Sequence, residues 1–345
     1  MARSSRLEPR SDWVELPDQQ LLDRTIASLG LTLEGSMVEP LLGRLDEELA
    51  RRGLRFRPYT WLSTDWFTPD DATGFAIPFY LAHPRLVSLE RRQMLEVEGG
   101  TKDECLKILR HETAHALDNA YRLRRKKLWR ETFGSASDPY DSSYTPDPTS
   151  RSHVLNLDHW YSQSHPLEDW AETFAVWLQP GARWRKRYAG WPALRKLEAV
   201  DELVRGIAED APAMRTRHKE DPVHRLTTTL RELYDRKKAF YAEESNPAFD
   251  GQLARVFPPP AEAAGRPRAA AFLRAKRRDL IKRVATATGQ HRYLLDHVVR
   301  EMIACCKQKD LRLAAAQSEA IVDAAVVLTS LSSQFLYGAH PRYQR

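Results

Sequence analysis

Two histidines and a glutamate stand within five consecutive residues, His111-Glu112-Thr113-Ala114-His115. Histidines four residues apart on a helix share a face, so both imidazoles can reach one metal ion. Neutral imidazole nitrogens suit zinc (Zn2+), and a glutamate beside the metal can take a proton from a bound water. The simpler alternative is a pair of surface histidines on a helix. We predict a zinc site with Glu112 as general base.

This motif needs a helix to carry it. Thr101 and Glu104 fit the capping-box pattern, a hydroxyl residue followed three positions later by glutamate. Two glycines precede this pair, and apolar residues follow at helical spacing. The pattern therefore predicts a helix from Thr101 to about Leu123, with both histidines inside it.

A catalytic zinc site also needs a third protein ligand and an open position for water. A second predicted helix, starting near Pro166 and ending by Pro180, carries Glu168 and Glu172 on one face, bordering an apolar stripe. Without the upstream motif, a solvated acidic edge would be the favoured explanation of the two acids. With it, the economical arrangement places Glu168 on zinc. Glu172 then stands behind it and accepts the second ring N–H of a ligand histidine, first of all His111.

The order of these two motifs resembles the gluzincin metallopeptidases. More narrowly, residues 160–178 resemble a bacterial family of zinc-binding metallopeptidases, which are minimal gluzincin-like catalytic domains; the sequence there is WYSQSHPLEDWAETFAVWL. Residues 74–84 also fit that family's pattern, and the resemblance covers about residues 36–190 of the chain. It implies zinc as cofactor, a peptide or protein substrate, Glu168 as ligand and Glu172 as its outer support.

The resemblance also bears on Tyr161, which stands seven residues before Glu168. In some gluzincins a tyrosine at that offset lines the site and steadies the oxyanion or the leaving group, so Tyr161 is a candidate electrophilic helper. A packed tyrosine is the alternative. His165 is a lower-ranked candidate for the same role, or it simply begins the helix.

One extended segment has a further use in this interpretation. Residues 76–82 are predicted to form a strand, and Pro78 suggests that it lies at the edge of its sheet. An extended peptide substrate could pair with such an edge through backbone hydrogen bonds. An ordinary edge strand without that role is equally compatible with the pattern.

The bulk composition is that of a globular protein with a well-solvated surface. The 345 residues are 42% hydrophobic and 29% charged, with a net charge of +6. Cys105, Cys305 and Cys306 give no disulfide framework, which favours a reducing, cytoplasmic setting. Cys105 is predicted to point away from the histidines, into the core. No signal-peptide core and no membrane-spanning stretch is visible in the sequence.

Two basic runs, residues 121–130 and 274–283, raise the question of a nucleic-acid partner. Positive charge near the end of a helix more commonly complements the helix dipole. Nucleic acid is therefore the less favoured partner, and no membrane partner is expected. The oligomeric state does not follow from the sequence.

Composition divides the chain into four parts, and the predicted fold class is α+β. The catalytic part contains a small mixed sheet, the two motif helices and a long loop at residues 133–152. The helical region is predicted to be broken near Gly289 and Asp310. The parts are an N-terminal tail and lead-in at 1–35, loose up to about residue 20, the catalytic domain at 36–250, a Pro- and Gly-rich linker at 251–267, and an all-helical region at 268–345.

These observations predict a zinc-dependent hydrolase of peptide bonds, in which Glu112 takes a proton from the attacking water. Two alternatives stay open. In the first, zinc is retained but the protein hydrolyses a different amide or only binds a partner. In the second, the protein is a nucleic-acid-associated module that uses the basic runs.

Overall fold

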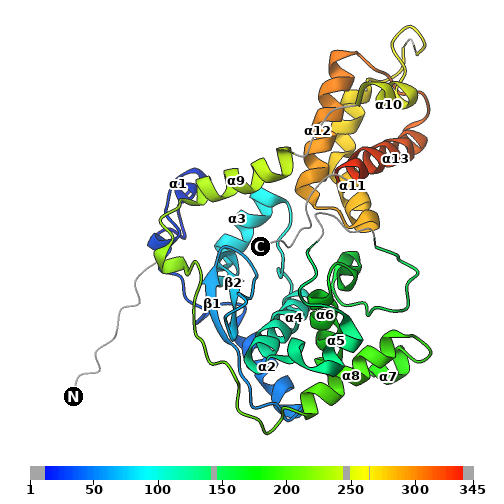
Figure 1. Ribbon diagram of the computed structural model, residues 1–345. Coiled ribbons are helices and arrows are strands. Elements are labelled where there is room, and N and C mark those ends of the chain that lie inside the picture. Colours follow the sequence, from blue (N-terminus) through cyan, green and yellow to red (C-terminus); the bar gives the residue numbers. More distant parts are fainter. Residues whose placement is uncertain (1–11, 141–145, 244–248, 264, 337–345) are drawn as a thin grey trace. The chain divides into compact units, whose positions relative to one another are not determined.

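The computed structural model describes residues 12–140, 146–243, 249–263 and 265–336. Within these residues the chain is mostly helical and has one two-stranded parallel sheet, which confirms the predicted α+β class. The chain forms two compact units (Figure 1). The first contains the described parts of Met1–Gln93, Val97–Asp138 and Asp147–Asp235, and the second those of Met94–Glu96, Pro139–Pro146 and Arg236–Arg345.

The first unit already includes the start of the described chain. Trp13 is buried, and its indole N–H donates to the carbonyl of Leu29 at 3.0 Å. Helix α1 (Asp18–Leu22) follows and buries two leucines. The predicted loose tail is therefore wrong for residues 12–20, because one tryptophan in a polar segment is enough to anchor it. Residues 1–11 of that predicted tail lie outside the described residues.

The sheet consists of β1 (Tyr59–Ser63) and β2 (Gly74–Pro78), and β2 is buried throughout. The side of β2 away from β1 is occupied at one residue, because the N–H of Ala76 donates to the carbonyl of Phe67 at 2.8 Å in an antiparallel bridge. In the two-stranded sheet β2 is an edge strand, as Pro78 suggested, although its free side is occupied at this one position. Pro78 is the last residue of β2, where a missing N–H ends the ladder.

Glycine is required where β2 begins. A Cβ on Gly74 would lie 2.1 Å from the carbonyl oxygen of Tyr59, its partner in β1. No side chain can be accommodated at that distance, so any other residue would push the two strands apart. The close pairing of the strands therefore depends on this one position.

Helices α4 (Lys102–Tyr121) and α6 (Pro166–Leu178) pack against each other in the first unit (Figure 1). Helix α4 begins as predicted, with the hydroxyl of Thr101 accepting the N–H of Glu104 at 3.3 Å. In α6 every residue after Pro166 is buried. The unit also contains α2 (Glu39–Arg51), α3 (Pro84–Met94), α5 (Lys127–Phe133), α7 (Trp184–Arg187), α8 (Ala193–Arg205), the start of α9 (Leu230–Glu243), and 3-10 helices at Ala27–Leu29, Phe79–Ala82, Leu123–Arg125, Asp158–Gln163 and Val223–Arg225.

A buried ion pair ties α2 to α4 immediately before the histidine motif. Arg110 donates two N–H groups to the carboxylate of Glu48, at 2.7 and 2.9 Å, and both side chains are buried. Two parallel hydrogen bonds fix the direction of both groups. The pair therefore holds α4 in the rotation that turns His111 towards α6.

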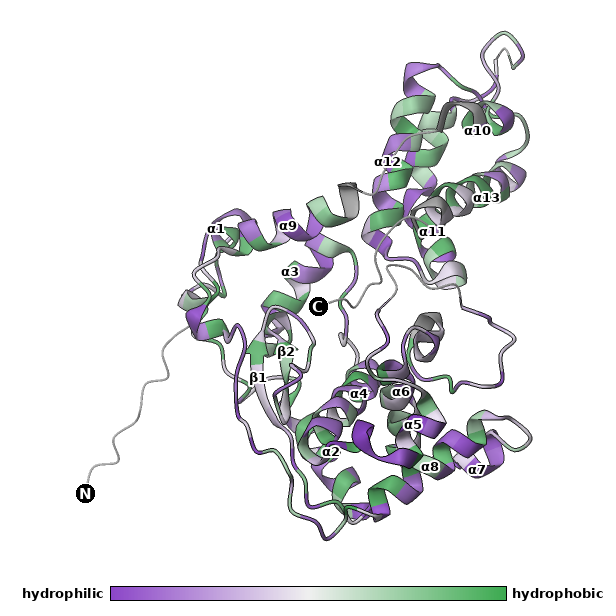
Figure 2. Ribbon diagram, viewed as in Figure 1, coloured by the Kyte–Doolittle hydropathy of each residue, from purple (hydrophilic) through white to green (hydrophobic). Residues whose placement is uncertain are grey.

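The second unit has a hydrophobic core of its own, to which four helices contribute. Figure 2 shows hydrophobic and hydrophilic residues alternating along α11 and α12, as in amphipathic helices with one buried face. The three helices predicted after residue 268 are present, with breaks near the predicted glycine and aspartate. The helices are α10 (Phe249–Val256), α11 (Ala269–Thr288), α12 (Arg292–Gln308) and α13 (Gln317–Leu336).

Helix α10 occupies the first part of the segment 251–267 that the sequence predicted as a linker. Leu253 and Phe257 are fully buried in the core of the second unit. A short amphipathic helix next to a proline run was overlooked because the prolines dominate the local pattern. The described residues between Pro258 and α11 contain no helix, and Gly265 among them has a positive φ of 78°.

Candidate metal centre

Helix α4 turns its histidine motif into the interior of the first unit. His111 and Glu112 are buried, and His115 is partly buried. The two imidazole rings lie 4.9 Å apart between centroids, as the spacing of four residues predicts. Their Nε2 atoms face each other at 3.1 Å. At that distance one ring can donate an N–H to the other, or both nitrogens can bind one metal ion.

Glu168, in the first turn of α6, brings a third atom to the same place. Its Oε2 lies 3.0 Å from Nε2 of His111 and 3.4 Å from Nε2 of His115. Ligand atoms about 2.0–2.1 Å from a tetrahedral zinc ion are ~3.3 Å from one another. The three atoms therefore have the spacing of three corners of such a site, and within the described residues this is the group that fits a metal ion.

The electrostatics of the cluster favour a positive charge at its centre. Burial by itself lowers the pKa of His111, but hydrogen bonds to Glu168 and Glu172 outweigh burial and raise this pKa well above its ordinary value. Burial raises the pKa of Glu168, but the charge of His115 and the hydrogen bond from His111 hold it well below its ordinary value. A buried carboxylate among imidazoles requires a cation, either a proton or a metal ion.

Glu172 lies one turn further along α6 and contacts the other side of the His111 ring. Its Oε1 is 2.9 Å from Nδ1 of His111. A carboxylate there accepts the Nδ1–H, so that in the neutral, metal-binding form of the ring the lone pair is on Nε2, the atom that faces His115 and Glu168. The structure thus brings together the four residues that the sequence analysis selected as ligands and support.

Asp169, the acid between these two glutamates, is turned away from the cluster. Its carboxylate lies 2.5 Å from Nζ of Lys196 and accepts a hydrogen bond from the hydroxyl of Thr173. Burial raises the pKa of Asp169 to about 6, although Lys196 opposes that shift. Helical spacing explains why Glu168 and Glu172 face the cluster and Asp169 does not, because residues four apart share a face and an adjacent residue does not.

Asn156 is a site residue that sequence reasoning missed. Its side-chain amide donates to Oε1 of Glu172 at 2.8 Å, and the backbone N–H of Leu157 donates to Oε2 at 2.8 Å. Both groups come from the irregular segment before α6. A single asparagine in a loop is most often a turn residue, so no sequence pattern pointed to it.

Glu112 is not among the three converging ligand atoms. Its Oε2 accepts a hydrogen bond from the hydroxyl of Thr68 at 2.8 Å. Thr68 follows Phe67, the residue bridged to β2, and lies 44 residues before Glu112 in the chain. The sequence carries no motif around Thr68, so this partner was also missed.

Tyr161 lies beside the metal cluster, whereas His165 lies at the start of α6. The ring of Tyr161 is buried and lies 5.8 Å from the ring of His111, so the structure brings this tyrosine to the cluster. His165 is the N-cap of α6, where its Nδ1 accepts the N–H of Leu167 and its Nε2 bonds the carbonyl of Asp138. Both ring nitrogens are therefore hydrogen-bonded at the start of the helix, in agreement with the interpretation that His165 simply begins the helix.

The remaining candidates have structural explanations. Cys105 is fully buried, and burial raises the pKa of its thiol to about 12. In the first basic run, Arg124 pairs with Asp118 and Asp70. In the second, charges are also partly paired within the helical unit, as Arg277 with Asp296 and Arg283 with Asp279.

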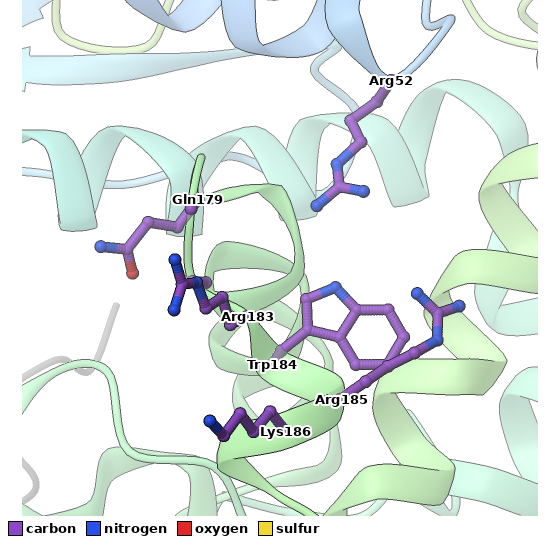
Figure 3. A pocket seen from close by; sticks show the side chains of 8 residues that line it. Arg52, Gln179, Arg183, Trp184, Arg185 and Lys186 are labelled. Atoms are coloured by element: carbon purple, nitrogen blue, oxygen red, sulfur yellow. The ribbon is translucent and has the colours of Figure 1, made fainter.

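A pocket at the carboxyl end of α6 contains none of the metal-cluster residues. Figure 3 shows Arg52 extending towards Trp184 from the opposite wall. Arg52 donates to the carbonyl of Trp177, and Arg185 pairs with Asp201. Cations are expected near the free carbonyls of a helix end, which explains Arg52, whereas the charge of Arg185 is balanced by Asp201. The lining residues are Arg52, Gln179, Gly181, Ala182, Arg183, Trp184, Arg185 and Lys186.

Comparison with known proteins yields no match, whether with family models, curated proteins or solved structures. The resemblance to the zinc-binding metallopeptidases therefore rests on the motif residues. To these the structure adds a buried cluster of His111, His115 and Glu168 able to hold a metal ion. Across the described ranges, no helix combines the length and the apolar character needed to cross a membrane.

Proposed function

We propose that this protein is a zinc-dependent metallopeptidase whose ligands are His111, His115 and Glu168. The observation that carries the proposal is the convergence of two Nε2 atoms and one carboxylate oxygen, 3.0 to 3.4 Å apart, in a buried position. Two imidazoles and a carboxylate leave one position of a tetrahedral zinc for water, which is the composition of a catalytic rather than a structural site.

Each residue of the site has a part in the proposed reaction. Bound zinc would act as a Lewis acid and lower the pKa of water to about 7. Glu112 takes the proton of the attacking water on its carboxylate and then delivers it to the leaving amine. Glu172 holds the His111 ring through Nδ1, 2.9 Å away. The Tyr161 hydroxyl donates to the developing oxyanion, a role supported by the packing of its ring against His111.

Metal binding is the first part of this proposal to test. Purified protein should contain one zinc per chain by elemental analysis, and His111→Ala should lose it because two remaining protein ligands bind zinc far more weakly than three. His224→Ala is the matched control, since His224 is exposed and lies outside the cluster. A folded wild-type protein that takes up no zinc, even on titration, would contradict the proposal.

Catalysis requires a separate test. Wild-type protein is incubated with an unbiased peptide library, and cleavage is followed by mass spectrometry. Glu112→Gln should lower the rate by about 100-fold or more while zinc remains bound, because the amide cannot accept the proton. Glu131→Gln, an exposed glutamate on α5, should cleave like the wild type. Cleavage that survives in Glu112→Gln would rule out this general base. Zinc binding without cleavage of any peptide would point to another amide substrate or to a binding protein.

A further inference from the structure

We propose that Thr68 is a positioning residue for Glu112, an inference that rests on the proposed function. The Thr68 hydroxyl lies 2.8 Å from Oε2 of Glu112 and 3.4 Å from the backbone carbonyl of the same residue. The shorter contact is the stronger one, so the single hydroxyl proton is directed at the carboxylate. Glu112 is only 7% exposed, so few water molecules compete for this bond.

The backbone on both sides of Thr68 is anchored. On one side, Phe67 accepts the N–H of Ala76, which ties the segment to β2 at 2.8 Å. On the other side, the side-chain amide of Asn119 donates to the carbonyl of Pro69 at 2.9 Å. A residue between two such anchors has little freedom to move, so its hydroxyl is held at a fixed place.

The second anchor comes from the helix that carries Glu112. Asn119 lies seven residues after Glu112, about two turns along the same face of α4. Arg124 donates to the amide oxygen of Asn119 at 2.8 Å, which leaves the NH2 group directed at the Thr68 segment. Helix α4 therefore supplies the base and also holds the segment that orients it.

This arrangement has a consequence for proton transfer. With the Thr68 hydroxyl donating to Oε2, the free oxygen of the Glu112 carboxylate is Oε1. The proton from the attacking water goes to Oε1 and later to the leaving amine, while the O–H bond of Thr68 stays intact throughout. Catalytic groups must be held within a few tenths of an ångström by supporting residues, and Thr68 supplies that support here.

The test compares three variants on the best-cleaved peptide of the library. Thr68→Val keeps the shape of the side chain but removes the hydroxyl, and should lower kcat about tenfold or more with KM nearly unchanged. Thr68→Ser keeps a hydroxyl and should recover most of the lost kcat. Thr73→Val is the matched control, because it removes a threonine hydroxyl that bonds the carbonyl of Thr216 at 3.0 Å, away from Glu112. Its kcat should stay near that of the wild type.

A second measurement does not depend on activity. A crystal structure of zinc-loaded Thr68→Val should show the Glu112 carboxylate displaced or in more than one rotamer. The inference is overturned if Glu112 keeps one unchanged conformation, if Thr68→Val retains wild-type kcat, or if Thr68→Ser is as slow as Thr68→Val. If the wild type cleaves no peptide, the proposed function fails, and the crystal structure still decides the role of Thr68.

Discussion

The carboxylate of Glu172 accepts hydrogen bonds from three donors, and each has a different origin. His111 belongs to the facing helix, while Asn156 and the backbone of Leu157 belong to the segment that precedes α6. Both carboxylate oxygens are engaged, so the group cannot rotate without losing a buried hydrogen bond. The hydrogen bond from Nδ1 to Glu172 thereby fixes the orientation of the His111 ring, and it does so without a bound metal ion.

Replacement of this carboxylate by an amide should therefore weaken zinc binding without removing a ligand. In Glu172→Gln the NH2 group must face one of three donors, so at least one buried hydrogen bond is lost. Zinc affinity, measured by competition with a chelator, should fall by about 10- to 100-fold. Glu198→Gln, an exposed change on α8, is the control. Equal zinc affinities for the wild type and Glu172→Gln would show that Glu172 does not support the metal site.

At the scale of elements, the site depends on where α4 and α6 begin. The N-cap of α4 is Thr101, which bonds the N–H of Glu104, and that of α6 is His165, which bonds the N–H of Leu167. Each cap gives a side-chain acceptor to a backbone N–H of the first turn and so stabilises the start of its helix. His111, Glu112 and His115 follow Thr101 by about three to four turns, so they lie well inside the helix that this cap begins.

Loss of the α4 cap should be measurable as stability. Thr101→Ala leaves the N–H of Glu104 without its side-chain acceptor and should lower the free energy of unfolding by about 1 kcal/mol. Thr101→Ser keeps the acceptor and should differ little from the wild type. Urea unfolding followed by circular dichroism compares the three proteins. If the urea midpoint of Thr101→Ala equals that of the wild type, the cap contributes nothing to stability.

The same scale shows which parts of the fold sequence patterns can predict. The two motif helices were predictable because caps, prolines and ligand spacing all follow local rules of helix geometry. Thr68 and Asn156 were not, since each lies in an irregular segment and reaches its glutamate only through tertiary packing. Pro78 correctly indicated an edge strand, but the sequence did not show that Phe67 occupies the free side of that strand at Ala76, because this contact also depends on tertiary packing.

At the scale of the whole molecule, the residues of the proposed site lie in only one of the two units. The metal cluster, Glu112, Thr68 and Tyr161 all belong to the first unit. The second unit buries its own apolar residues, among them Leu253, Phe257 and Met302, in a separate core. Separate cores favour separate unfolding transitions, since each core can lose its packing by itself.

Calorimetry of the full chain with and without zinc should therefore resolve two transitions, of which one responds to the metal. Zinc at 100 times its dissociation constant stabilises the unit that binds it by about 2.7 kcal/mol. For a unit of this size, that corresponds to a rise of roughly 5–10 °C in the Tm of one transition. The other transition, assigned to the helical unit, should not move. His111→Ala should abolish the zinc-dependent rise and leave the second Tm in place. If zinc raises the Tm of both transitions together, the two units unfold as one. Calorimetry would then not support the assignment of the metal to the first unit alone.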